Sequence, residues 1–237
     1  VTYLSTTLNG CVDGGGNSGW LFTDTTLRYW VGGTGNWSDT NHWSTTSGGA
    51  GGSSVPSISN PVYVDGNSFS VAGTLSLTGG SCYSINTTGA ILGVTLEHVS
   101  NATLNIYTDL IFTSNITYHI AGHGYWPGDW HYTKINITGI YVSTIIFDCT
   151  STYTGNGDLY SFNTSVSCAI NLQSDLTFPI NESAHDIAFN ISGEFHTNNY
   201  NIISLGKVPI NIHGLGVYFR EYFDDSINYF NCIKNSH

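Results

Sequence analysis

The segment LNIYTDLIF, residues 104–112, recurs as INLQSDLTF at residues 170–178, with apolar and polar residues at the same positions. The separation is about three times the roughly 20 to 25 residues that one turn of a β-solenoid uses. The recurrence therefore predicts one structural unit used twice, a few layers apart in one stack. The paired asparagines, Asn105 and Asn171, and the paired aspartates, Asp109 and Asp175, are then expected at turns or edges rather than in a catalytic site.

Short alternating stretches separated by Gly, Asn, Ser and Asp continue through the rest of the chain and predict strands. No window has apolar residues at helical spacing with good helix formers between them. We expect an all-β protein, a parallel β-helix or solenoid-like single domain, with a β-sandwich completed by a donated strand as the alternative. The expected strands are 74–77, 91–96, 104–112, 117–120, 135–147, 170–178, 187–191 and 202–205.

The N-terminal region has a different composition. Residues 1–8 are extended and β-prone, and a Gly-rich loop follows at residues 10–19. We expect residues 1–19 to be an extended segment, able to add as a strand to a neighbouring subunit or to its own domain, and residues 20–237 to be a single all-β domain.

Charge excludes several classes of partner. Charged residues make up 9% of the 237 residues, and five Lys and Arg stand against sixteen Asp and Glu, for a net charge of -11. Phosphate binding requires clustered cations, so nucleic acid is excluded as a partner, and anionic lipid and polyuronates are disfavoured. No apolar run approaches the ~18 residues of a membrane span, which predicts no membrane insertion.

Eight Asn-x-Ser/Thr patterns predict N-glycosylation and covalently attached glycans. The chain has 15 Tyr, 11 Phe and 6 Trp, so it is expected to fold despite its low charge, with a Ser-, Thr- and Asn-rich surface typical of secreted proteins. A chain without Met that starts at Val1 is expected to have lost a signal segment. The expected location is the extracellular space or the cell surface. The acceptors are Asn36, Asn86, Asn101, Asn115, Asn136, Asn163, Asn181 and Asn190.

The five cysteines have spacings unlike those of zinc or haem motifs. Two disulfides and one remaining cysteine are the simplest arrangement. The spacings favour pairing Cys149 with Cys168, about one turn apart, and Cys11 with Cys82, although sequence does not fix the connectivity. Cys232 would then be free or would link subunits.

A Trp-rich block at residues 29–44 contains Gly35-Asn36-Trp37 and is followed by Val55-Pro56 and by the Asp-containing segment 62–69. This block resembles one that opens β-helix regions in large secreted prokaryotic surface and adhesin-like proteins. Residues 193–202 resemble the ending that recurs after each turn in those proteins. The resemblance implies a β-helix and a surface location, and it implies no catalytic residues.

The sequence contains candidate residues for three kinds of site: a metal site, a glycan-cleaving site and a carbohydrate-binding site. His119, His123, Asp129 and His131 lie in a Gly- and Pro-rich segment that disfavours helical metal-ligand spacing, so no metal and no cofactor are expected. Glycan cleavage needs two converging carboxylates, and no pair stands out, so no catalytic residue and no enzyme activity are predicted. Exposed tryptophans could stack on carbohydrate instead, the candidates being Trp37, Trp43, Trp126 and Trp130.

The function predicted from these features is a structural subunit of a glycosylated surface filament or sheath. Its partner would be another copy of itself, joined head-to-tail through strand and aromatic contacts. The alternatives are a carbohydrate-binding adhesin or virion spike module and, less favoured, a glycan-processing enzyme. The expected assembly or glycan-stacking residues are Val1, Tyr3, Leu4, Trp126, Trp130, Tyr218 and Phe219.

Overall fold

The computed structural model describes a large part of the chain, in the ranges given at the end of this paragraph. Their secondary structure is β-strand throughout, apart from one 3-10 helix, η1 (Thr40–His42). The all-β prediction is therefore confirmed. The described residues are 6–9, 20–23, 26–121, 132–139, 142–154, 159–164, 169–178, 187–192, 194–196, 198, 202–204, 210–213 and 230–231.

The strands form three large sheets and two strand pairs. The five-stranded sheet holds β4 (Gly35–Asn36), β7 (Gly73–Leu77), β10 (Val94–His98), β13 (Ile116–Ala121) and β16 (Thr150–Thr154). The seven-stranded sheet holds β8 (Gly80–Cys82), β11 (Thr103–Ile106), β14 (Tyr132–Ile137), β17 (Leu159–Thr164), β20 (Ile187–Ser192), β23 (Ile210–His213) and β24 (Phe230–Asn231). The eight-stranded sheet holds β3 (Arg28–Trp30), β5 (Trp43–Ser44), β6 (Pro61–Tyr63), β9 (Ser84–Asn86), β12 (Leu110–Phe112), β15 (Val142–Phe147), β18 (Ala169–Leu172) and β21 (Glu194–His196). The pairs are β1 (Thr6–Asn9) with β2 (Trp20–Thr23), and β19 (Leu176–Phe178) with β22 (Ile202–Ser204).

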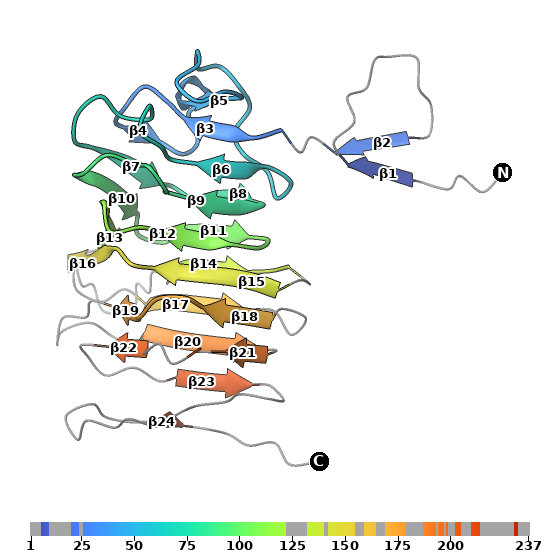
Figure 1. Cartoon of the computed structure of the whole chain (residues 1–237). Coiled ribbons are helices and arrows are strands. Elements are labelled where there is room, and N and C mark those ends of the chain that lie inside the picture. Colours follow the sequence, from blue (N-terminus) through green and yellow to red (C-terminus); the bar gives the residue numbers. More distant parts are fainter. Residues whose placement is uncertain are drawn as a thin grey trace.

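From β6 to β18, the chain visits the three sheets in turn, so that a strand pairs with the strand three places later in the sequence. We call one such pass through the three sheets a level; the levels lie one above another (Figure 1). The pairings between the described strands are parallel except for β3 with β5. A sandwich of antiparallel hairpins, the alternative expected from the sequence, does not have this pairing.

The sequence repeat does not coincide with the pairing register. Asn105 lies in β11 and pairs with Asn136, whereas Asn171 lies in β18 of a different sheet. The expectation that the two copies are equivalent positions of one stack is therefore wrong. The reason is that a strand, a polar turn and a second strand make a similar sequence wherever the chain passes from one sheet to the next. The expected strands 104–112, 135–147 and 170–178 each divide into two strands for the same reason.

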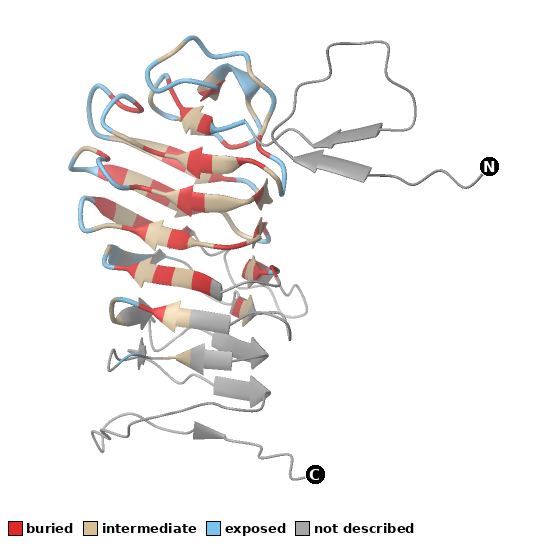
Figure 2. Cartoon of the chain, turned by 45° about the vertical axis from the view of Figure 1, so that its right-hand side comes forward, coloured by how far each residue is buried: buried red, intermediate tan, exposed pale blue. Residues whose placement is uncertain are grey.

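The core lies between the sheets, because alternate residues of each strand point inward (Figure 2). β10 and β13 show strict alternation of buried and partly exposed residues. Inward residues stack level on level, as Leu75, Leu96 and Tyr118 do in the five-stranded sheet, and all three side chains are fully buried. Burial of each such side chain contributes about 1.5 to 3 kcal/mol.

Three tryptophans close the N-terminal end of this core. Trp30, Trp37 and Trp43 are at most 1% exposed and pack edge to face in two contacts, with ring centroids 5.1 and 4.8 Å apart. Trp43 Nε1 donates to the Trp37 carbonyl over 2.7 Å. His42 stacks on Trp30 at 4.6 Å, and a Cβ at Gly35 would overlap that imidazole, so this position requires glycine. We call Trp30, Trp37 and Trp43 the tryptophan cap.

Cys82 is a free cysteine on the inward face of β8, fully buried in register with Ile106. The expected Cys11–Cys82 disulfide is therefore wrong for Cys82, because the alternation of β8 points its side chain into the core. Burial also raises the pKa of the thiol and keeps it protonated. Cys11, Cys168 and Cys232 lie outside the described residues, so the Cys149–Cys168 pairing stays a prediction.

His98 is another titratable group in this core. It is fully buried at the end of β10, and its Nδ1 lies 2.6 Å from the Tyr118 hydroxyl. Burial disfavours the charged imidazolium and lowers the pKa to about 4, against a smaller opposing effect of a backbone hydrogen bond at Ala102.

This shift predicts a loss of stability in acid. The unfolded chain takes up a proton near pH 6.5 while folded His98 does not until about pH 4. Unfolding therefore becomes easier as the pH falls through this window, by about 3 kcal/mol between pH 7 and pH 4. Urea unfolding of the wild type and of His98→Gln at both pH values measures this contribution as the difference between their pH dependences. Equal pH dependences would show that His98 does not cause it.

Candidate functional site

Three groups of polar side chains lie on the outside of the sheets. The first is a ladder of asparagine amides on the seven-stranded sheet. Asn136 Nδ2 donates to Asn105 Oδ1 over 2.8 Å, and Asn163 Nδ2 donates to Asn136 Oδ1 over the same distance. Each asparagine follows a buried apolar residue of its strand, so strand alternation points all three outward, where they are partly exposed. We call Asn105, Asn136 and Asn163 the asparagine ladder.

The register continues this column beyond the described side chains. Asn163 pairs with Asn190 in β20, Asn190 with Asn211 in β23, and Asn211 with Asn231 in β24. Asparagine thus occupies the same register position in six consecutive strands. Sequence reasoning missed this ladder, although its signal is present as asparagine directly after an apolar residue, from Leu104-Asn105 to Phe230-Asn231.

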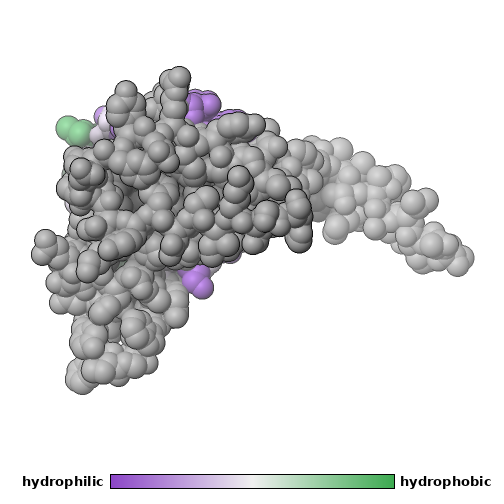
Figure 3. Space-filling model, turned by 90° about the horizontal axis from the view of Figure 1, so that it is seen from below, coloured by the Kyte–Doolittle hydropathy of each residue, from purple (hydrophilic) through white to green (hydrophobic). Residues whose placement is uncertain are grey.

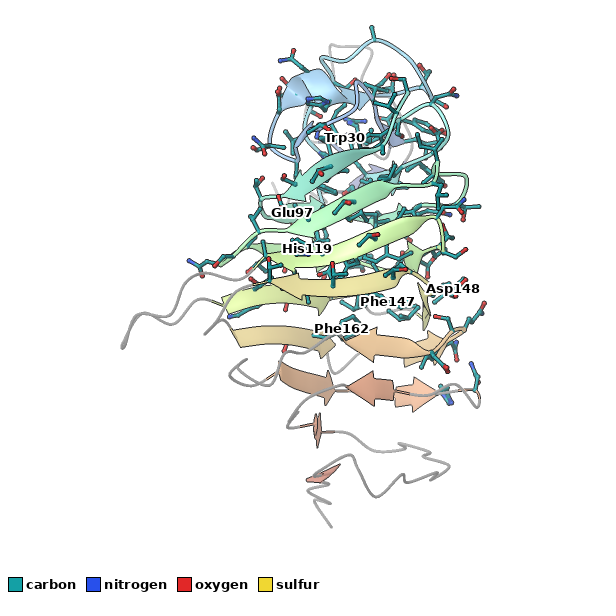
Figure 4. The ribbon with its side chains drawn as sticks, turned by 90° about the vertical axis from the view of Figure 1, so that its left-hand side faces the viewer. Trp30, Glu97, His119, Phe147, Asp148 and Phe162 are labelled. Carbon is teal, nitrogen blue, oxygen red and sulfur yellow. The ribbon has the colours of Figure 1, made fainter. Side chains whose placement is uncertain are left out.

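The second group is a polar column on the five-stranded sheet, formed by Ser76, Glu97, His119 and Thr152 at matched register. Ser76 Oγ donates to Glu97 Oε2 over 3.0 Å. His119 Nδ1 lies 2.8 Å from Thr152 Oγ1, and its Nε2 lies 3.0 Å from Thr154 Oγ1. Figure 4 shows Glu97 and His119 on adjacent strands.

The polar column does not make a metal site. Both ring nitrogens of His119 are engaged by threonine hydroxyls, and within the described ranges no group of three or more His, Cys, Asp or Glu could hold an ion. The other residues of the candidate metal cluster considered from the sequence lie outside the described residues; they are His123, Asp129 and His131.

The third group lines a pocket of about 560 Å³ where the chain passes from β15 to β16 and from β18 to β19. We call it the corner pocket. Asp148 and Asp175, from successive levels, both line it, and Figure 4 shows Asp148 at the edge of the sheets, outside buried Phe147. Phe147 N–H donates to Ser174 Oγ over 2.5 Å, which fixes one wall to the next level. The remaining lining residues are Ser114, Ile146, Cys149, Thr150 and Gln173.

The expected turn aspartates have different roles. Asp109 Oδ1 accepts a hydrogen bond from the Thr144 backbone N–H over 2.7 Å, so it is a structural residue at a strand edge, as predicted. Asp175 lines the corner pocket together with Asp148, a pairing that the sequence did not suggest because the two residues are distant along the chain.

Two of the four tryptophans expected to hold carbohydrate are in the core. Trp37 and Trp43 belong to the tryptophan cap and present no face to solvent, so the prediction is wrong for them. An apolar ring flanked by Gly and Asn looks exposed in sequence, but here it fills the open end of the core. Trp126 and Trp130 lie outside the described residues, as do Val1, Tyr3, Leu4, Tyr218 and Phe219.

The described outer surface carries scattered apolar side chains. Large exposed apolar residues are Leu27, Ile58, Val71 and Leu92. In the view from below, the described residues that are visible lie at the rim and are mostly hydrophilic (Figure 3). None of the described helical segments is long and apolar enough to cross a membrane.

Comparison with protein-family models, with curated proteins and with solved structures finds no match.

The asparagine ladder predicts a measurable contribution to stability. Asn136→Ala removes the two amide hydrogen bonds with Asn105 and Asn163 and should lower the free energy of unfolding by about 1 to 2 kcal/mol. Asn36→Ala is the matched control, because Asn36 is exposed at the end of edge strand β4, and it should change stability by less than about 0.5 kcal/mol. Denaturant unfolding of the wild type and the two variants, all made without glycans, measures these changes in the free energy of unfolding. Equal stabilities of the two variants would contradict a structural role for the ladder.

Proposed function

We propose that this chain is a structural subunit of an extracellular surface filament or sheath, and that its three parallel sheets form a parallel β-helix, or solenoid. Pairing of each strand with the strand three places later supports the β-helix, since a chain wound around one axis meets itself once per turn. The resemblance of residues 29–44 to β-helix openings in prokaryotic surface proteins points in the same direction.

The observation that carries the filament proposal is the β1–β2 pair. These two strands of four residues pair in parallel and belong to none of the three large sheets, and Figure 1 shows them beside the sheets instead of on them. A two-stranded parallel pair is not independently stable and leaves two open edges. A second copy of the chain would supply the missing strand.

The tryptophan cap supports placing this junction outside the first level. Its three rings are buried in their own chain, so they offer no apolar surface to a second copy. Head-to-tail assembly therefore proceeds through the β1–β2 pair of one copy and the far end of the next. Glycans and an Asn-, Ser- and Thr-rich surface would keep the sides soluble.

Deletion of residues 1–25 tests this assembly. The shortened chain starts before β3 and keeps the tryptophan cap but loses Trp20, so its thermal unfolding should match that of the full chain, whereas its tryptophan fluorescence should lack the contribution of Trp20. Electron microscopy and sedimentation should show filaments for the full chain and single particles for the deletion. Leu8→Pro in the full chain should also reduce assembly, because proline cannot donate in β1. Filaments from both variants, or single particles from the full chain, would contradict the proposal.

The corner pocket favours a second candidate function, carbohydrate binding. Hydroxyl, amide and carboxylate groups line it together, and such groups hydrogen-bond sugar hydroxyls. The pocket also contains two carboxylates, the residue type that glycan processing uses.

Oligosaccharide arrays test the pocket directly. The wild type and the control Glu97→Gln, whose residue does not line the pocket, should bind the same sugars. The double variant with Asp148→Asn and Asp175→Asn should bind at least tenfold more weakly, as expected for about 1.4 kcal/mol or more from charge-assisted hydrogen bonds. Failure of the wild type to bind any sugar would remove this candidate.

A further inference from the structure

The seven-stranded sheet ends at an open strand edge. β24 is the last strand of this sheet and pairs with β23 on one side, and the described strands include none on its other side. Figure 1 shows β24 at the end of the stack farthest from β3. An unpaired edge presents backbone N–H and C=O groups that a further strand can satisfy. The residues at this edge therefore specify which strand fits there.

Two residue columns reach this edge in fixed register. In the first column, asparagine occupies each strand of the sheet from β11 to β24. The residue before each asparagine is apolar, and these residues form the second column. A strand that continues both columns must carry an apolar residue followed directly by asparagine. The members of the apolar column are Leu104, Ile135, Phe162, Phe189, Ile210 and Phe230.

β1 carries this pair of residues as Leu8-Asn9. Its segment Thr7-Leu8-Asn9 has the same residues as Thr103-Leu104-Asn105 of β11. Four described strands lie outside the three large sheets, namely β1, β2, β19 and β22, and β1 alone among them has asparagine after an apolar residue. β1 pairs with β2 through one edge, and its other edge faces no described strand. This second edge is therefore available to β24.

β1 of the same chain does not reach β24 while it stays paired with β2. β8 and β24 are the first and last of seven strands, so six spacings of about 4.8 Å, roughly 29 Å, separate them. β3 lies at the β8 end of the stack (Figure 1). The chain from Thr23 of β2 to Arg28 of β3 spans at most about 18 Å, and β1 lies one strand spacing beyond β2. A second copy must therefore supply the strand.

We infer that β1 of one copy adds in parallel to β24 of the next copy, with Asn9 beside Asn231. Leu8 then lies beside Phe230. The inference rests on the proposed filament and adds the register of its junction. In the pairs whose side chains are described, the amide of the later strand donates to the amide oxygen of the earlier strand. A strand added after β24 takes the donor's place in this order, so Asn9 extends the asparagine column across the junction.

Only this register continues both columns. A shift by one residue places Leu8 or Gly10 beside Asn231, and it also exchanges the two faces of the strand, because side chains alternate between them. A shift by two residues keeps the faces but places Thr7 or Cys11 beside Asn231. Neither of these residues has an amide to continue the column.

Disulfide crosslinking between two variants tests this register. Both are full chains with Cys11→Ser and Cys232→Ser. One also carries Asn9→Cys and the other Asn231→Cys, so a link between residues 9 and 231 joins two copies. The variants are mixed, assembled and treated with oxidised glutathione, and the linked peptides are quantified by mass spectrometry. Facing residues on neighbouring strands have Cα atoms about 4.8 Å apart, which is within the range of a disulfide.

Thr7→Cys in place of Asn9→Cys is the matched control, because residue 7 lies on the same face of β1, two residues away. Its Cα atom would lie about 8 Å from that of residue 231. The link from residue 9 should be at least about tenfold more abundant than the link from residue 7, because Cα atoms more than about 7 Å apart are not bridged without backbone movement. Equal yields, or no link from residue 9, would overturn the inference.

Asn9→Ala tests the amide separately. Loss of one interstrand hydrogen bond per junction should raise the concentration needed for assembly about fivefold, measured by sedimentation. Thr7→Ala, outside the asparagine column, should change it less than about twofold. An unchanged concentration for Asn9→Ala would contradict the proposed register. Wild-type filaments without the expected link overturn this inference alone, whereas single wild-type particles in electron microscopy overturn the proposed filament as well.

Discussion

The structure depends on one constraint, the in-register backbone hydrogen bonding of each strand to the strands of the levels before and after it. Parallel strands cannot be joined by a tight turn, so the chain must travel through two other sheets before it returns to the first. Three sheets are then built together, and each residue meets its register partner from the next level. Inward positions become continuous apolar columns, and outward positions become continuous polar ones.

This arrangement explains why the functional features are columns instead of clusters from one segment. Asn105, Asn136 and Asn163 share a register position, and their amides complete one another's hydrogen bonds along the sheet axis. Ser76, Glu97 and His119 are aligned in the same way on another sheet. A chain arranged in this manner presents repeated polar surfaces along its sheets.

Such an arrangement leaves the core open at its first level, because no earlier level packs against it. The tryptophan cap solves this at the N-terminal end with buried rings and a short antiparallel strand, β5, that returns along β3. The sequence identified the Trp-rich block at residues 29–44 as distinctive and as similar to the opening of a β region. It could not show that Trp37 and Trp43 face inward, because a residue beside Gly and Asn looks exposed until a core is present for it to cover.

The sequence by itself determined the strand-rich class, through the alternation of residues such as those at 94–98 and 116–121. It also determined the shortage of cations, from which we predict that the chain does not bind nucleic acid. It also predicted that Asp109 is a structural residue at a turn or strand edge. Tertiary structure alone decided which strands pair, and hence that Asn105 meets Asn136 instead of Asn171, that Cys82 is a buried thiol, and that Asp148 shares a pocket with Asp175. The physical reason is that alternation acts between neighbours along one strand, whereas register is set by hydrogen bonds between segments some 20 to 35 residues apart, whose spacing varies from level to level.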